Sequence, residues 1–267
     1  MMKTALEQAA GSDTVITPII RYDQSVSKGI LFTIKEHLIT DIIIGVTQSG
    51  SKKSQIGETT DQILDHTEQT VFVHHSVQPF NTLARIVVVI NKHAEWEEGF
   101  NHWVNKVLTI SKESGLPLTI YCNGTIKEAV DAVNHASAKP LNISFESWED
   151  WDDFLILSRE LQPNDLFIVV ISRKGYSSYH AKLAKTSYYL NKYFAKFSYI
   201  LLYPQQKITY SKLTDLHHEE GTILDVFTEG RKVAEKTSSL IGNLFRKDGA
   251  RNANSTDDDN SGTDKDA

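Results

Sequence analysis

Short runs of β-branched and aliphatic residues alternate along this chain with segments whose apolar residues recur at helical spacing. Residues 85–90 (Arg-Ile-Val-Val-Val-Ile) form one such run, and residues 97–113 follow with a helical pattern. This alternation is typical of parallel strands joined by right-handed βαβ crossovers. The pattern therefore predicts an α/β fold built on a doubly wound parallel sheet.

Residues 82–204 contain a complete set of elements for such a sheet. The predicted strands are residues 85–90, 116–121, 141–145, 165–171 and 198–202. The predicted helices are residues 97–113, 125–136, 148–161 and 179–194. We interpret residues 82–204 as one complete five-stranded domain.

Residues 1–78 supply fewer strands. The predicted strands are residues 13–20, 39–46 and 71–74, and the predicted helices are residues 25–37 and 61–66. In a five-stranded doubly wound sheet, the two absent strands would lie between the first of these strands and the other two. Residues 1–78 are thus predicted to be a truncated unit. Either the chain is a piece of a longer gene product, or another surface fills the gap, since an open gap would expose strand edges and apolar faces.

The chain after residue 204 no longer alternates between predicted strands and helices. Residues 205–246 form a C-terminal extension with a helix candidate at residues 223–245, which Gly230 and Gly242 weaken. Residues 247–267 are rich in Asn, Ser, Asp and Gly and cannot bury enough apolar area to become ordered. We predict a disordered tail there.

Composition and charge favour a globular protein and argue against several other classes of protein. The chain has 267 residues, of which 40% are hydrophobic and 23% charged, as in globular proteins. Its formal net charge of -6 argues against a general nucleic-acid binder, because affinity for phosphate backbones comes from Lys and Arg. Cys122 is the single cysteine, so no internal disulfide can form, and the apolar runs fall short of the roughly 20 residues that span a bilayer. We expect a soluble, cytoplasmic protein.

Two segments resemble a known family. Residues 21–45, from Arg-Tyr-Asp-Gln-Ser to Asp-Ile-Ile-Ile-Gly, resemble the second half of a universal stress protein domain, whose fold is of the adenine-nucleotide alpha-hydrolase type. More narrowly, they resemble the cytosolic C-terminal region of cation/proton antiporters of the Kef and sodium/hydrogen exchanger type. Residues 172–180 and 199–204 look like the end of the second domain of that region. The resemblance covers roughly residues 1–206 and implies a tandem pair of such domains.

The resemblance also implies a function. The absent strands and the membrane domain of an antiporter would lie upstream of Met1, and this chain would be the soluble regulatory or sensing region of the transporter. It would act by dimerisation or by ligand binding that favours one transporter conformation. In that setting it would be a membrane-associated homodimer whose partner is the antiporter membrane domain. The alternative is a free-standing universal stress protein that binds ATP or another nucleotide.

Universal stress proteins that bind ATP use a glycine-rich loop after the fourth strand, where backbone N–H groups and a helix N-terminus hold phosphate. The equivalent run here is residues 45–60. Its candidate phosphate-binding residues are Gly45, Gly50, Lys52, Gly57, Thr59 and Thr60. Against ATP, Gln48 stands at the second glycine of the pattern, and Glu58 places a carboxylate where an anion should sit. A polar surface loop is the competing interpretation.

A second candidate loop follows the predicted strand at residues 165–171. Arg173, Lys174 and Gly175 lie at the carboxyl end of that strand, where open α/β sheets bind ligands, so this loop is a candidate anion site. Asn91 replaces the Asp that the family carries after its first strand, which weakens an ATP assignment. The competing interpretation is a solvated basic loop.

No enzymatic motif was found in the sequence. It has no Gly-x-Ser-x-Gly elbow and no Walker lysine motif. The pairs His74-His75 and His217-His218 do not suggest a metal site, because adjacent residues on a strand point to opposite faces. We expect a protein that is not an enzyme, with no metal and with ATP or another nucleotide as the candidate cofactor.

Overall fold

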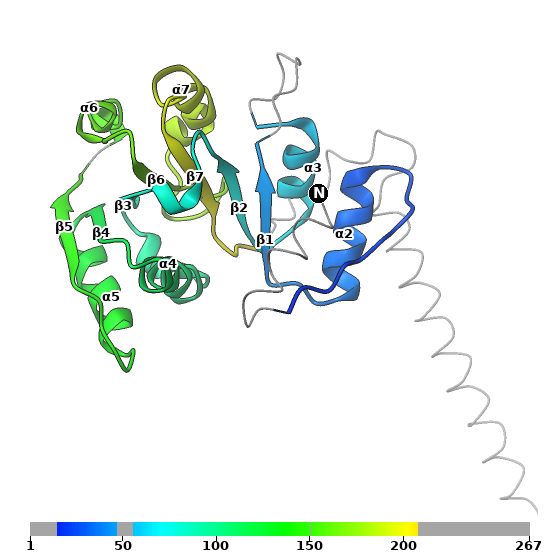
Figure 1. Cartoon of the computed structure of the whole chain (residues 1–267), viewed down its shortest axis with the longest axis horizontal. Coiled ribbons are helices and arrows are strands. Elements are labelled where there is room, and N and C mark those ends of the chain that lie inside the picture. Colours follow the sequence, from blue (N-terminus) through cyan, green and yellow to red (C-terminus); the bar gives the residue numbers. More distant parts are fainter. Residues whose placement is uncertain (1–14, 47–55, 150, 208–267) are drawn as a thin grey trace, which may run out of the picture. The chain divides into compact units, whose positions relative to one another are not determined.

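The computed structural model describes residues 15–46, 56–149 and 151–207, which form a seven-stranded mixed sheet with helices on both faces (Figure 1). The sheet order is β1-β2-β7-β6-β3-β4-β5. The strands are β1 (Asp41–Gly45), β2 (Thr70–His75), β3 (Arg85–Val89), β4 (Leu118–Cys122), β5 (Ile143–Ser147), β6 (Asp165–Val170) and β7 (Ser198–Tyr203). The predicted α/β fold with a mostly parallel sheet is confirmed.

Six α-helices connect or precede these strands in the described part of the chain. They are α2 (Val26–Glu36), α3 (Glu58–His66), α4 (Phe100–Ser114), α5 (Gly124–His135), α6 (Leu157–Glu160) and α7 (Thr186–Tyr193). Helix α2 begins where the sequence predicts, because the Ser25 side chain accepts a hydrogen bond from the Lys28 amide at 3.3 Å. Helix α4 ends at Gly115, whose φ of 69° is a left-handed conformation that glycine adopts without strain.

One sheet runs through both predicted units, and its single antiparallel junction lies between them. Strand β2 pairs with β7 in antiparallel register, with Phe72 opposite Leu202, while every other neighbouring pair of strands is parallel. The last strand of the first predicted unit therefore joins the last strand of the second. The division into units at residues 78–82 stays a prediction, because the sheet is continuous across it.

The predicted strand at residues 13–20 is wrong for residues 15–20, which have no regular secondary structure. Val15, Ile16, Ile19 and Ile20 are all exposed, so these apolar residues lack the neighbouring strand that would form a ladder with them. Pro18 in the middle of the run removes one backbone donor as well. The run therefore has strand composition without a strand partner.

The single helix predicted at residues 148–161 is also wrong. The structure has a 3-10 turn at Trp151–Asp153 and the short α6 instead. Trp151, Phe154 and Leu157 are nevertheless buried, at a spacing of three residues that suits a 3-10 turn as well as an α-helix. The spacing of the apolar residues was thus visible in the sequence, but it did not decide the type of helix.

Helices cover both faces of the sheet beside β3 to β7. Helices α4 and α5 lie on one face, and α6 and α7 lie on the other (Figure 1). Under α4 the core includes Trp103 and Val107, while on the α7 side Phe194 packs against Phe154 at 5.2 Å and Phe167 at 5.3 Å between ring centroids. Strand β6 is buried along its whole length, as its uninterrupted apolar run predicts.

The helix predicted at residues 223–245 and the tail at residues 247–267 lie outside the described residues, as do residues 208–222. In the ranges that the structure covers, no helix is both long and apolar enough to cross a membrane.

Candidate functional site

The topology creates one crevice of the kind that binds ligands in open α/β sheets. From β3 the chain proceeds to β4 on one side, whereas β6 lies on the other side of β3, so the strand order reverses at this point. Ligands in such sheets bind outside the carboxyl ends of the two strands at the reversal. Here those ends are followed by Asn91 and by Ser172 to Gly175.

Side chains of the protein itself fill this crevice. Glu97 is only 8% exposed, and its carboxylate accepts hydrogen bonds from the backbone N–H and the hydroxyl of Ser178, at 3.0 and 2.5 Å, and from the Gln206 amide. Asn91 donates to the Ser178 carbonyl at 2.5 Å and accepts from the Trp151 indole N–H. We call these five residues the crevice cluster. A ligand would have to displace hydrogen bonds that buried polar groups need.

The candidate anion-binding residue Arg173 is engaged with the backbone. Its guanidinium donates to the carbonyls of Leu64, Thr67 and Gln69, with the Leu64 and Gln69 contacts at 3.3 and 3.0 Å. Burial lowers the pKa of Arg173 from its ordinary value. An anion would compete with three carbonyls for this side chain, which fastens the loop after β6 to the end of α3. These contacts link positions more than 100 residues apart, and no sequence signal announces them.

The other two residues of this predicted anion site, Lys174 and Gly175, are exposed. Gly175 has a φ of 99°, which favours glycine at this turn. The described contacts do not bring a second basic side chain to Lys174. Anion binding by these three residues stays a prediction, with Lys174 as the cation that faces solvent.

The first candidate loop is only partly described. Gly45 is the last residue of β1, and Gly57 directly precedes α3 with a φ of 109°, so the predicted phosphate loop runs from the end of a strand to the start of a helix. Thr59 is partly exposed, whereas the buried Thr60 hydroxyl has no hydrogen-bond partner among the described atoms. Gly50 and Lys52 lie outside the described residues. Nucleotide binding at this loop stays a prediction.

Sequence reasoning missed a charged contact between α4 and the start of β1. His102 Nε2 lies 2.7 Å from Asp41 Oδ1, and Lys106 Nζ lies 3.0 Å from Asp41 Oδ2. Partial burial opposes ionisation, but the hydrogen bonds from His102 and Lys106 outweigh it and lower the pKa of Asp41. His102 and Asp41 are 61 positions apart, so the pairing follows from the fold alone.

The Asp41 contact predicts a pH-dependent contribution to stability. A carboxyl whose folded pKa is depressed stabilises the fold above its unfolded pKa and loses that effect as pH falls through the folded pKa. We expect Asp41→Asn to lower the free energy of unfolding by about 0.5 to 1 kcal/mol at pH 7, in the range of partly exposed pairs. The difference between variant and wild type should shrink below about pH 4. Urea unfolding at several pH values measures it, and a difference that does not change with pH would contradict the assignment.

Cys122 and His75 are two further side chains with potentially reactive atoms in the described ranges. Burial raises the pKa of Cys122 to about 12, so its thiol stays protonated at neutral pH. His75 stacks on Tyr199, with 4.8 Å between ring centroids. In the described part of the chain no group of three or more His, Cys, Asp or Glu side chains could hold a metal ion. His217 and His218 lie outside that part.

Neither a family model nor a curated protein matches the sequence. Several solved structures are similar in fold. A protein of Pseudomonas aeruginosa PAO1 described as functionally unknown has 12% identity and a TM-score of 0.49, covering 76% of this chain and 77% of its own. A putative universal stress protein from P. aeruginosa UCBPP-PA14 has 10% identity and a TM-score of 0.48, with 76% and 77% covered. A universal stress protein from Archaeoglobus fulgidus DSM 4304 has 16% identity and a TM-score of 0.47, with 78% and 76% covered. These values assign neither ligand nor activity to this chain.

Proposed function

We propose that this chain is a cytoplasmic regulatory module that self-associates through the free edge of β1 and acts on a cation/proton antiporter. The antiporter rests on the sequence resemblance of residues 21–45 and 172–180. The self-association rests on the observation that β1 is apolar and that, among the residues that the structure describes, no strand pairs with its outer edge. Because the protein's own side chains fill the crevice, we favour a binding module over an enzyme that depends on a nucleotide.

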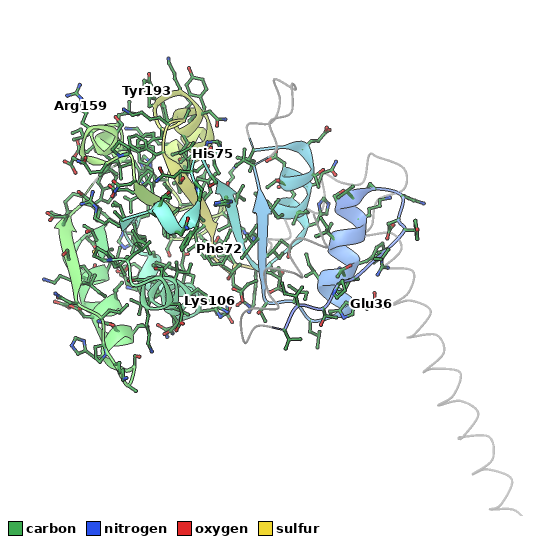
Figure 2. The ribbon with its side chains drawn as sticks, in the orientation of Figure 1. Glu36, Phe72, His75, Lys106, Arg159 and Tyr193 are labelled. Carbon is green, nitrogen blue, oxygen red and sulfur yellow. The ribbon has the colours of Figure 1, made fainter. Side chains whose placement is uncertain are left out.

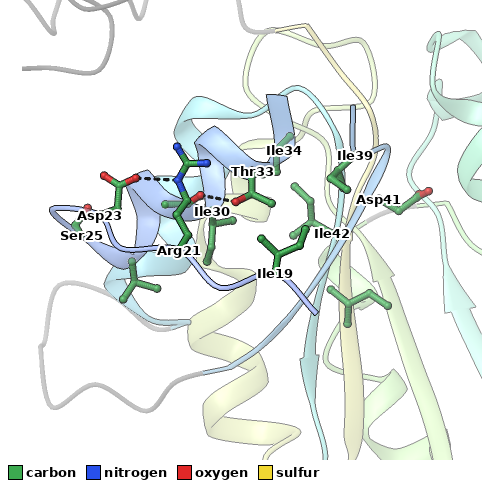
Figure 3. A pocket seen from close by; sticks show the side chains of 13 residues that line it. Ile19, Arg21, Asp23, Ser25, Ile30, Thr33, Ile34, Ile39, Asp41 and Ile42 are labelled. Carbon is green, nitrogen blue, oxygen red and sulfur yellow. Dashed lines mark hydrogen bonds and ion pairs between the residues drawn. The ribbon is translucent and has the colours of Figure 1, made fainter. Parts of the chain in front are cut away.

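Apolar side chains gather around this edge. A groove of about 530 Å³ lies between α2, the segment that precedes it and β1, with Ile19, Ile30 and Ile42 in its wall (Figure 3). Ile43, in the middle of β1, is 78% exposed. Further exposed apolar residues of this part of the chain are Val15, Ile16, Ile20, Tyr22, Val26 and Leu38. A surface of this kind marks an interaction site in a soluble protein.

The two edges of the sheet are chemically different. Strand β5, at the opposite edge, carries Ser144, Glu146 and Ser147 among its five residues. Polar and charged residues of this kind protect an edge strand from pairing. Strand β1 has Asp41 at its start and then only isoleucine and glycine. The unprotected edge is therefore β1.

The sequence of β1 is self-complementary. The Val46 N–H donates to the His74 carbonyl of β2, so by alternation the backbone groups of Ile43 point to the free edge. An antiparallel pair centred on Ile43 would place Asp41 opposite Gly45 of a second copy and Ile42 opposite Ile44. No like charges face each other in this register. The occupant that this edge fits is a second copy of the chain.

Replacement of Ile43 by Asp tests the proposed dimer. The change places two carboxylates opposite each other on the two-fold axis, so we expect the dimer dissociation constant to rise by about tenfold or more. Sedimentation velocity at micromolar concentrations measures it. Ile156→Asp introduces the same charge at a residue that is 51% exposed and remote from β1 in the sheet order, and should leave the dimer intact. A wild-type monomer would remove the proposal of self-association.

Transport assays test the antiporter separately. Everted membrane vesicles that contain one cation/proton antiporter of the source organism are assayed for sodium- and potassium-dependent proton exchange, with and without the purified chain. We expect the wild-type chain to change the exchange rate and the Ile43→Asp variant to change it less. If no antiporter of that organism responds, the regulatory role is lost. Saturable binding of ATP with magnesium that disappears in Gly57→Val would instead favour a free-standing universal stress protein.

A further inference from the structure

Charge is unevenly distributed along this acidic chain. Between Asp165 and Asp215 the sequence has no Asp or Glu, whereas the same stretch carries eight Lys and Arg residues. Aromatic residues are interleaved with these cations, most densely in the Ser-Tyr-Tyr-Leu-Asn-Lys-Tyr-Phe run of residues 187–194. The net charge of -6 for the whole chain therefore hides a basic, aromatic segment.

The fold presents this segment on one surface. The 3-10 turn Ala181–Lys185 and α7 cover the face of the sheet opposite α4 and α5 (Figure 1). Figure 2 shows Tyr193 of α7 and Arg159 of α6 on the same outer side of the sheet. We define the α7 surface by the exposed lysines and tyrosines of residues 181–196, which are Lys182, Lys185, Tyr188, Lys192, Tyr193 and Lys196.

Two lysines of the α7 surface, Lys192 and Lys196, lie beside aromatic rings. Lys192 Nζ lies 5.2 Å from the centroid of the Tyr193 ring and 5.7 Å from that of Tyr188, and Lys196 Nζ lies 5.1 Å from that of Phe197. Among the residues that the structure describes, no carboxylate forms an ion pair with Lys185, Lys192 or Lys196. Acidic side chains of the described residues thus do not neutralise the charges of these three lysines.

We propose that the α7 surface binds the surface of an anionic lipid bilayer. Clustered lysines are attracted to anionic headgroups, and their aliphatic stems can lie along apolar material while the ammonium groups stay in water. Tyrosines that are half-exposed, such as Tyr188 at 48% and Tyr193 at 41%, suit the interfacial region because the ring is apolar and the hydroxyl polar. The acidic remainder of the chain would be repelled by the same headgroups, which orients the protein with α7 toward the lipid.

A bilayer fits this surface better than a single-stranded nucleic acid does. Proteins that bind single strands track the backbone in a basic groove and stack bases on exposed rings. The groove described above lies at α2 and β1, and its lining includes six isoleucines, two aspartates and one arginine, whereas the α7 surface is the outside of a helix. The tyrosine rings there also lie beside Lys192. This inference does not depend on self-association or on an antiporter.

Vesicle flotation tests the proposal with the full chain. The probes are phosphatidylcholine vesicles and vesicles of phosphatidylcholine with 30% phosphatidylserine, in low salt. We expect binding to the anionic vesicles alone, and its loss in 0.5 M salt, because the attraction is electrostatic. Lys185→Glu, Lys192→Glu and Lys196→Glu combined should weaken the binding by about 100-fold or more, since each lysine near an anionic membrane contributes about a fivefold factor.

A matched variant separates the α7 surface from net charge. Lys112→Glu, Lys127→Glu and Lys139→Glu change the charge equally at exposed positions on and after α4 and α5, the helices of the other face. We expect this variant to keep most of the binding. Equal losses of vesicle binding in the two variants would overturn the proposal. It would also be overturned if the wild-type chain bound a labelled thirty-nucleotide DNA strand but not the anionic vesicles. Circular dichroism verifies that both variants are folded, so that a loss of binding reports on the surface.

Discussion

Replacement of Arg85 by Met is expected to lower the free energy of unfolding by about 2 to 3 kcal/mol, the largest effect that we predict for an ion pair here. Asp165 is 2% exposed and accepts two hydrogen bonds from Arg85, at 3.1 and 2.5 Å, across the β3–β6 pair. Without Arg85, the Asp165 carboxylate would still accept a hydrogen bond from the Gln162 N–H. Its negative charge would otherwise be buried without the cation that now pairs with it. Arg85 itself is about one-third exposed, which places the estimate below that for a fully buried pair.

Two further variants make this expectation specific. Lys92→Met removes the pair between Lys92 and Glu149, which is 3.0 Å long and exposed at both ends, and should cost less than about 1 kcal/mol. Combining Arg85→Met with Asp165→Leu removes the buried charge and should restore part of the lost stability. Urea unfolding followed by tryptophan fluorescence measures all three. A cost for Arg85→Met no larger than that for Lys92→Met would contradict the role of the buried pair.

Gly99→Ala is the second change expected to have a large effect, at about 2 to 3 kcal/mol. A Cβ atom at Gly99 would lie 2.5 Å from the Gln205 carbonyl oxygen and 3.1 Å from the Gln205 nitrogen. Since these are backbone atoms, the segment after β7 would have to move. That movement would withdraw Gln206 from Glu97 and leave a buried carboxylate with fewer donors. The crevice cluster would open as a result.

Gly124→Ala is the matched control for this prediction. Gly124 begins α5, and a Cβ atom there would meet nothing within 4 Å, so alanine should be neutral or stabilise by up to about 1 kcal/mol. Chemical denaturation compares the two variants under the same conditions. If Gly99→Ala proved as stable as wild type, the close packing of residues 204–206 over the start of α4 would be wrong.

The sequence by itself determined the elements of this protein and their order. Strands β3 and β6 were predicted within one residue at their ends, because a continuous apolar run suits a strand buried on both faces. Helix α2 was predicted because Ser25 precedes apolar residues at helical spacing. The basic segment after Asp165 also lies in the sequence, but the net charge of the whole chain did not predict it.

Only the tertiary structure decided how those elements pair. Residues 15–20 have strand composition, but a strand needs a neighbour, and the fold supplies none there. The antiparallel β2–β7 junction, the contact of His102 with Asp41 and the position of Arg173 join residues from 61 to more than 100 positions apart. Spacing along the chain reports local hydrogen bonding and which side of an element is apolar. Contacts between distant residues depend on how the elements pack, so the closed crevice and the open edge of β1 became visible only in the folded chain.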